Sequence, residues 1–159
     1  MHITMLPRLF CLTIIGLSLF PLFNGCQSVQ HSSQPLSSQL TGTWQLQEGR
    51  LIENGDTSIT LYKGDTSFIK IINKTHFAFL QHDQQKDSSG IFAAGGGRYT
   101  LDGNRYTEHL EYCNARNWED NSFSFTIEIK GDTLIQSGVE KIDSLGINRI
   151  NTEMYTRLP

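Results

Sequence analysis

The chain has 159 residues, of which 38% are hydrophobic and 18% are charged, and its formal net charge is -3. This length supports a single folded domain, and the balance of apolar and charged residues argues against a wholly disordered chain. The mean hydropathy of -0.31 excludes a protein with several membrane spans, and the negative charge gives no electrostatic reason to expect nucleic-acid binding.

Residues 1–25 have the pattern of a secretory signal, because a basic residue precedes a mostly apolar run at 9–20 that is too short to span a bilayer comfortably. Gly25 directly precedes Cys26, which resembles the lipobox of bacterial lipoproteins. The two positions before Gly25 hold Phe and Asn, where that family usually has Leu and a small residue. The resemblance implies cleavage before Cys26 and lipidation of its sulfur. We therefore expect an exported cell-envelope protein, held at the outer membrane by lipid; the alternative is an ordinary signal peptide with Cys26 incidental.

Residues 26–39 are rich in Ser and Gln and show no hydrophobic periodicity, which predicts a flexible tether ahead of the folded domain. If Cys11 is lost with the signal and Cys26 is lipidated, Cys113 is the one cysteine left with a free thiol. We therefore expect no disulfide within the chain, and we interpret Cys113 as a small, half-buried residue at the end of a strand.

The domain at 40–159 is predicted to be all-β, because short β-rich runs alternate with turn dipeptides such as Asp102-Gly103 and Gly131-Asp132. Tight turns between neighbouring runs indicate an antiparallel, up-and-down sheet. A sheet of about 8–10 strands in a small domain is expected to close into a β-barrel. The predicted strands are 41–48, 57–62, 67–72, 75–81, 97–101, 104–112, 123–130, 133–138 and 149–157.

Alternation along these strands predicts which side chains point into the barrel. A two-residue loop at Asp102-Gly103 would pair Tyr99 with Tyr106 and Gly97 with Glu108. A similar loop at Gly131-Asp132 would pair Ile127 with Gln136 and Ile129 with Leu134. The side chains expected inside from these strands and from the hairpin at Asn73-Lys74 are Phe68, Lys70, Phe77, Phe79, Tyr99, Leu101, Asn104, Tyr106, Glu108, Leu110, Tyr112, Phe123, Phe125, Ile127, Ile129, Leu134 and Gln136.

Gly42-Thr43-Trp44 opens the first strand and Arg157 closes the last one. This pairing resembles the lipocalin and wider calycin signature, in which an arginine from the final strand covers the tryptophan and closes the barrel. The alternative is a core tryptophan and an unrelated surface arginine. Residues 40–158 also resemble uncharacterised lipocalin-like lipoproteins of bacteria, through segments such as 70–72, 95–108, 129–132 and 153–157. The resemblance implies a calycin-type barrel without an established activity, and no second lipocalin motif is recognisable.

Glu108 is the leading candidate for a ligand-binding residue, because a carboxylate inside an apolar barrel is costly unless it is paired. Lys70, Arg157 or a cationic ligand could supply the partner, and a purely structural ion pair is the alternative. The candidate pocket residues are Lys70, Tyr99, Tyr106, Glu108, Gln136 and Tyr155. Tyr155 and Arg157 also resemble, in residue type, the pair that holds a carboxylate in fatty-acid-binding calycins, a role that competes with barrel closure by Arg157.

The sequence indicates no metal, cofactor or catalytic motif, because the histidines lack ligand spacing and no nucleophile signature is present. Our first hypothesis is a lipid-anchored envelope protein whose barrel binds a small, partly apolar molecule. The alternative is an envelope module for protein–protein interaction with a filled barrel. An internal cavity of about 300 Å³ or more would favour the first hypothesis. A third and weaker hypothesis, an isomerase or hydrolase, requires a second titratable group within hydrogen-bond reach of Glu108.

Overall fold

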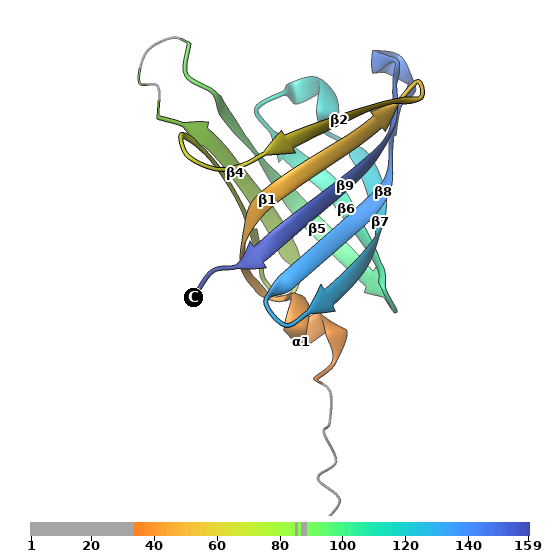
Figure 1. Ribbon diagram of the computed structural model, residues 1–159. Coiled ribbons are helices and arrows are strands. Elements are labelled where there is room, and N and C mark those ends of the chain that lie inside the picture. The colour runs from red at the N-terminus through yellow and green to blue at the C-terminus, as the bar shows by residue number, and fades with distance from the viewer. Residues whose placement is uncertain (1–33, 85, 87–88) are drawn as a thin grey trace, which may run out of the picture. The chain divides into compact units, whose positions relative to one another are not determined.

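A computed structural model describes residues 34–84, 86 and 89–159, which form an all-β domain (Figure 1). The predicted signal and the predicted lipidation of Cys26 concern residues outside this described part of the chain. None of the helices within the described residues has the length and apolar character needed to cross a membrane. The described elements are α1 (Leu36–Leu40), β1 (Gly42–Glu53), β2 (Asp56–Leu61), β3 (Thr66–Ile72), β4 (His76–Asp83), β5 (Phe92–Asp102), β6 (Arg105–Cys113), η1 (Arg116–Trp118), β7 (Asn121–Lys130), β8 (Thr133–Ile142), η2 (Asp143–Leu145) and β9 (Ile147–Arg157).

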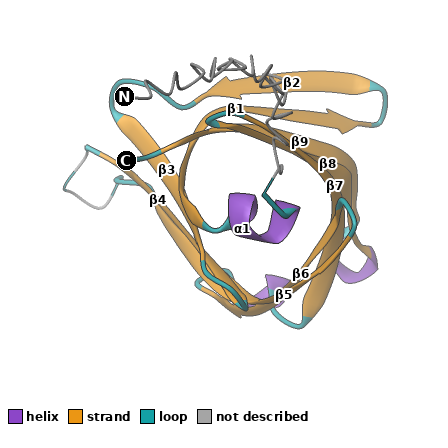
Figure 2. Cartoon of the chain, turned by 90° about the horizontal axis from the view of Figure 1, so that it is seen from below, coloured by secondary structure: helices purple, strands orange, loops and turns teal. Residues whose placement is uncertain are grey.

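Eight of these strands close into an antiparallel barrel, and β2 is an additional strand outside the ring (Figure 2). The first part of β1, at 42–45, pairs with β3, whereas its later part, at 48–53, pairs with β2. The opposite edge of β1 pairs with β9 along most of its length, and this pairing completes the ring. The predicted all-β barrel and its nine strands are therefore confirmed, with β2 as the strand that the barrel does not use.

The helix α1 covers one end of the barrel and contributes the fully buried Leu40 (Figure 2). The Nε1–H of Trp44 donates a hydrogen bond to the carbonyl oxygen of Leu40 at 2.8 Å, and the indole is fully buried. Residues 36–39 were predicted to belong to the flexible tether, and that boundary is wrong. Apolar burial of Leu40 and the contact with Trp44 hold this segment as a helical turn against the barrel.

The guanidinium carbon of Arg157 lies 4.0 Å from the centroid of the Trp44 ring, so the expected contact between these two residues is present. Arg157 also donates hydrogen bonds to the carbonyl oxygens of Gln39 and Thr41. Gly42 has a φ of +150°, and a Cβ there would collide with the guanidinium of Arg157. The backbone conformation thus favours glycine at this position of the Gly-Thr-Trp sequence, and a Cβ would also have to displace the end of the Arg157 side chain.

The β5–β6 hairpin differs from its predicted register by two residues. Tyr99 pairs with Glu108, and Gly97 pairs with Leu110, because the chain turns at Gly103-Asn104 instead of Asp102-Gly103. A shift of two residues preserves the side of the sheet on which each side chain lies, so Glu108 still points inward. Asn104, predicted to be inside, is exposed in the turn.

Tyr112 was also predicted to be inside, and it is 69% exposed. The register shifts between Gly96 and Gly97, so Glu111 is an extra residue on β6 and reverses the alternation beyond it. Cys113, at the end of β6, is half-buried as predicted. The other two hairpins agree with their predicted arrangement: β7 and β8 pair Ile127 with Gln136, and the inward face of β3 carries the buried Lys70.

We expect Trp44→Ala to lower the free energy of unfolding by about 3–5 kcal/mol, because it empties a fully buried site and removes the contacts with α1 and Arg157. Urea titration measures the change. Tyr112→Ala removes an exposed aromatic ring and is the control, with an expected change within about 0.5 kcal/mol. An unchanged unfolding midpoint for Trp44→Ala would show that the indole does not stabilise the closed end.

Candidate functional site

A cavity of about 380 Å³ lies inside the barrel and reaches the connection between β6 and β7. This connection is at the end of the barrel away from α1 (Figure 1). Its size falls within the range of small-molecule sites and exceeds the volume expected to distinguish a binding barrel from a filled one. The lining side chains come from the seven strands β3 to β9 and from the β6–β7 connection. They are Phe68, Lys70, Phe79, Gln81, Ala93, Glu108, Leu110, Cys113, Asn114, Ala115, Trp118, Phe123, Phe125, Gln136, Glu140, Arg149, Asn151 and Glu153.

Aromatic side chains form much of the apolar wall of the cavity. Phe68 on β3 and Phe79 on β4 stack with ring centroids 5.7 Å apart, and Trp118 lies 6.0 Å from Phe123 on β7. Phe125 continues this wall along β7, where inward residues alternate with outward ones. A ligand in this cavity would bury apolar surface against these rings.

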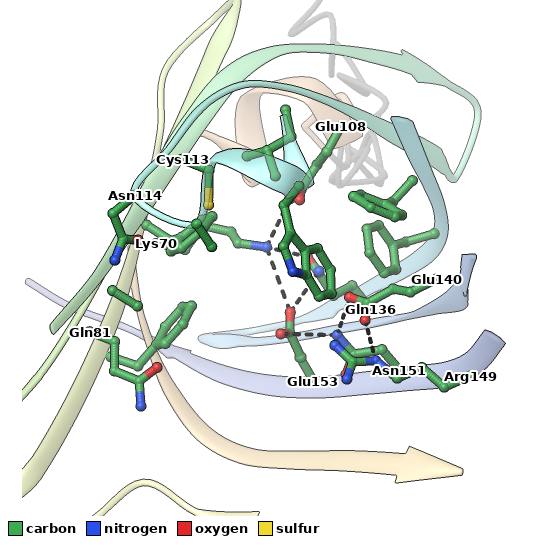
Figure 3. Close-up of a pocket in the computed structure, with 18 residues that line it drawn as sticks. Lys70, Gln81, Glu108, Cys113, Asn114, Gln136, Glu140, Arg149, Asn151 and Glu153 are labelled. Carbon is green, nitrogen blue, oxygen red and sulfur yellow. Dashed lines mark hydrogen bonds and ion pairs between the residues drawn. The ribbon is translucent and has the colours of Figure 1, made fainter. Parts of the chain in front are cut away.

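Lys70 is the central polar residue of the cavity, and its side chain is only 3% exposed (Figure 3). Its ammonium donates hydrogen bonds to Glu108 Oε1 at 2.8 Å and to Gln136 Oε1 at 3.1 Å. Glu153 Oε2 lies 3.6 Å from the same nitrogen. One cation from β3 is therefore shared by side chains from β6, β8 and β9, and of the partners considered for Glu108 it is Lys70 that pairs with it.

Glu153 connects this centre to the rest of β9. Its Oε2 accepts hydrogen bonds from Gln136 Nε2 at 2.7 Å and from the hydroxyl of Tyr155 at 2.6 Å. Its Oε1 accepts a longer bond, 3.3 Å, from Asn151 Nδ2. The donors that surround this carboxylate are neutral, apart from the shared ammonium of Lys70.

A second ion pair lies farther along the cavity wall. Arg149 Nε donates to Glu140 Oε2 at 2.7 Å, and Asn151 Nδ2 donates to Glu140 Oε1 at 2.8 Å. The guanidinium of Arg149 also lies 5.3 Å from the centroid of the Trp118 ring. Glu140 is thus held by one cation of its own.

Burial and the neighbouring charges determine the protonation of the central pair. Burial lowers the pKa of Lys70, but the carboxylates of Glu108 and Glu153 outweigh that effect and the pKa is raised above its usual value, so the ammonium stays charged. Burial raises the pKa of Glu108, and the ammonium of Lys70 offsets only part of that increase. The carboxylate of Glu108 therefore depends on its contact with Lys70.

The structure separates the predicted pocket residues into two groups. Lys70, Glu108 and Gln136 line the cavity, whereas Tyr99, Tyr106 and Tyr155 do not. Tyr155 is fully buried and acts on the site through its hydrogen bond to Glu153.

Tyr99 and Tyr106 pack against each other with ring centroids 5.1 Å apart. The hydroxyl of Tyr99 donates to the carbonyl of Asn73, and the hydroxyl of Tyr106 is buried near Glu108. Burial and the charge of Glu108 raise the pKa of Tyr106, so that hydroxyl remains protonated. These two tyrosines belong to the packed interior.

The lining residues missed at the sequence level include four members of the hydrogen-bonded polar network: Glu140, Arg149, Asn151 and Glu153. The signal for three of them was present, because residues 149, 151 and 153 share the face of β9 that carries the inward Tyr155. Glu140 was missed because the predicted strand stopped at 138, whereas β8 continues to Ile142. Within the described residues no group of histidine, cysteine and acidic side chains is arranged to hold a metal ion.

Comparison with known proteins finds no matching family model and no matching curated protein. A redesigned β-barrel is 16% identical to the chain with a TM-score of 0.47, and the match covers 77% of this chain and 95% of that protein. An uncharacterised protein from Bacteroides eggerthii is also 16% identical with a TM-score of 0.44, over 74% of this chain and 98% of its own. What the cavity binds therefore has to be inferred from its own residues.

We expect Lys70→Met to lower the free energy of unfolding by about 3–5 kcal/mol near neutral pH, because Glu108 would remain buried without its cation. The raised pKa of Glu108 means that the folded state keeps a proton that the unfolded chain releases above about pH 4.5. The stability of the variant should therefore fall as pH rises from about 4.5 through the raised pKa of the folded protein.

Urea titrations at about pH 5 and about pH 7.5 test this dependence. Lys130→Met is the control, because Lys130 is 78% exposed and its pairing with Glu128 contributes little. Lys70→Met combined with Glu108→Gln should recover part of the loss at the higher pH. A loss for Lys70→Met that does not change with pH would contradict the dependence of Glu108 on this ammonium.

Proposed function

We propose that this protein is a lipid-anchored cell-envelope protein whose barrel binds a small, partly apolar molecule. The observation that carries the proposal is the internal cavity of about 380 Å³, which combines aromatic walls with a buried ion network around Lys70. Protein interiors are close-packed and contain few voids larger than a water molecule. At ~30 Å³ for each water, this cavity has room for about a dozen waters or for one small organic ligand. It therefore favours binding over a module with a filled barrel.

Binding also explains the central ion pair better than catalysis does. Lys70 satisfies the requirement for a titratable group within reach of Glu108, since the two side chains are 2.8 Å apart. However, the raised pKa of Lys70 keeps its proton in place, and its donors already face protein oxygen atoms. A charged lysine in this state is neither a base nor a nucleophile. The pair provides a constant electrostatic environment, which is what a binding site needs.

Filling the cavity should prevent binding. Ala93 on β5 lines the cavity, and its neighbour Ala94 lies on the outer surface. We expect Ala93→Leu to reduce the occupancy of a bound compound at least about tenfold, or ~1.4 kcal/mol, whereas Ala94→Leu should leave it unchanged. Native mass spectrometry of protein purified from its own host measures the occupancy, because a bound compound adds to the mass of the native protein and is lost when the protein is denatured.

The two variants differ by one position on the same strand, so a general effect of added bulk would appear in both. Retention of the same mass by Ala93→Leu would contradict the cavity as the binding site. A wild-type protein that releases no compound would contradict ligand binding itself.

The envelope location rests on the sequence at the start of the chain, where Gly25 and Cys26 follow the apolar run of the predicted signal. Multiple acyl chains on Cys26 would make the anchor effectively stable. We expect Cys26→Ala to move the protein from the membrane fraction to the soluble fraction, whereas Cys113→Ala should remain in the membrane fraction. Ultracentrifugation followed by immunoblotting measures the distribution. If Cys26→Ala still requires detergent for extraction, lipidation at this residue is wrong.

A further inference from the structure

Positive and negative charges are not balanced around the cavity. Among the described residues that line it, Lys70 and Arg149 are cationic, whereas Glu108, Glu140 and Glu153 are acidic. With Glu108 kept as a carboxylate by its contact with Lys70 and the other four groups ionised, the cavity carries one excess negative charge. An uncompensated charge in a water-poor interior is unfavourable, so a cation that enters the cavity would be stabilised there.

The ammonium of Lys70 is surrounded by protein oxygen atoms, two of which accept its hydrogen bonds. A lysine has three N–H groups, and those of Lys70 face Glu108 at 2.8 Å, Gln136 at 3.1 Å and Glu153 at 3.6 Å. A ligand carboxylate that approached this nitrogen would also approach the carboxylates of Glu108 and Glu153, which repel it. Lys70 is therefore a neutralising group of the protein and not a receptor for an anion.

The excess charge belongs to Glu153. Glu140 has Arg149 as its own partner at 2.7 Å, and Glu108 has the closer contact with Lys70. Glu153 has only the longer contact with the shared ammonium, and its hydrogen bonds come from the neutral groups of Gln136, Tyr155 and Asn151. Neutral donors hold a carboxylate in place without cancelling its charge.

The apolar wall is also suited to a cation. Phe68, Phe79, Phe123 and Trp118 surround the same volume, and the face of an aromatic ring attracts positive charge. The same rings favour an apolar body over a fully hydrated ion. Charge and wall composition thus point to one ligand class.

We infer that the cavity binds a small, partly apolar amine or ammonium compound and discriminates against carboxylates. This inference rests on the proposed binding function and specifies the charge of the ligand. The ligand cation would lie near Glu153, with its apolar portion against the aromatic wall. An anionic ligand would add a second uncompensated negative charge to the cavity.

Isothermal titration calorimetry with phenethylamine, phenethyl alcohol and phenylacetate tests the charge preference, because the three probes share one ring and differ in the polar group. At neutral pH we expect the amine to bind at least about tenfold more tightly than the alcohol, and the carboxylate to bind more weakly than either. Equal binding of amine and alcohol, or tighter binding of the carboxylate, overturns the charge inference and leaves the binding function standing. Absence of binding by all three probes overturns both proposals.

Two variants test the assignment of the excess charge to Glu153. Glu153→Gln keeps the shape of the side chain and removes its charge, so the advantage of the amine over the alcohol should fall about tenfold while the alcohol still binds. Glu128→Gln removes an exposed carboxylate on β7 and should leave the advantage unchanged. The alcohol titration also shows whether Glu153→Gln has kept its cavity. An amine preference that survives Glu153→Gln overturns the assignment.

Discussion

The ammonium of Lys70 lies inside a closed barrel, and much of the surrounding structure follows from the need to compensate its charge. Glu108, Gln136 and Glu153 reach it from three different strands. A slip of one residue in any of these strands would turn the partner to the outer surface. The cluster therefore requires a particular register of β3, β6, β8 and β9. The polar side chains of this cluster contact one another, and apolar side chains do not fill all of the interior around them. The cavity lies in this remaining space, beside the cluster.

The backbone of β5 adapts the barrel to this arrangement. Phe79 projects across Gly95, where a Cβ would collide with its ring, and a Cβ at Gly97 would collide with the carbonyl of His109. The glycines thus allow close approach of β4 and β6 at the point where Glu111 is inserted. The resulting bulge turns Tyr112 outward and makes Cys113, with the residues after it, part of the cavity lining.

Strand alternation was sufficient to predict nine strands and the inward position of Lys70, Glu108 and Gln136. Successive side chains of a strand point to opposite sides of the sheet, so the side on which a residue lies does not depend on its exact cross-strand partner. The same pattern could not distinguish a turn at Asp102-Gly103 from one at Gly103-Asn104, since both turns leave each side chain on the same side of the sheet. It also could not reveal an inserted residue such as Glu111 or the helical turn α1, which depend on contacts between distant parts of the chain. The second ion pair was missed for a different reason, because Glu140 lies beyond the predicted end of its strand although it pairs with Arg149 across a local hairpin.

The inward residues of β9 have different roles at the two ends of the barrel. Arg157 is held by the carbonyls of Gln39 and Thr41 and by the ring of Trp44, so its charge stabilises the closed end. It is therefore not paired with Tyr155 as a carboxylate receptor. Tyr155 instead donates to Glu153, the residue left without a cation of its own. Glu153 and Arg157 lie four residues apart on β9, or about 13 Å along the strand, so the arginine that closes one end of the barrel is too far along β9 to be the partner of Glu153.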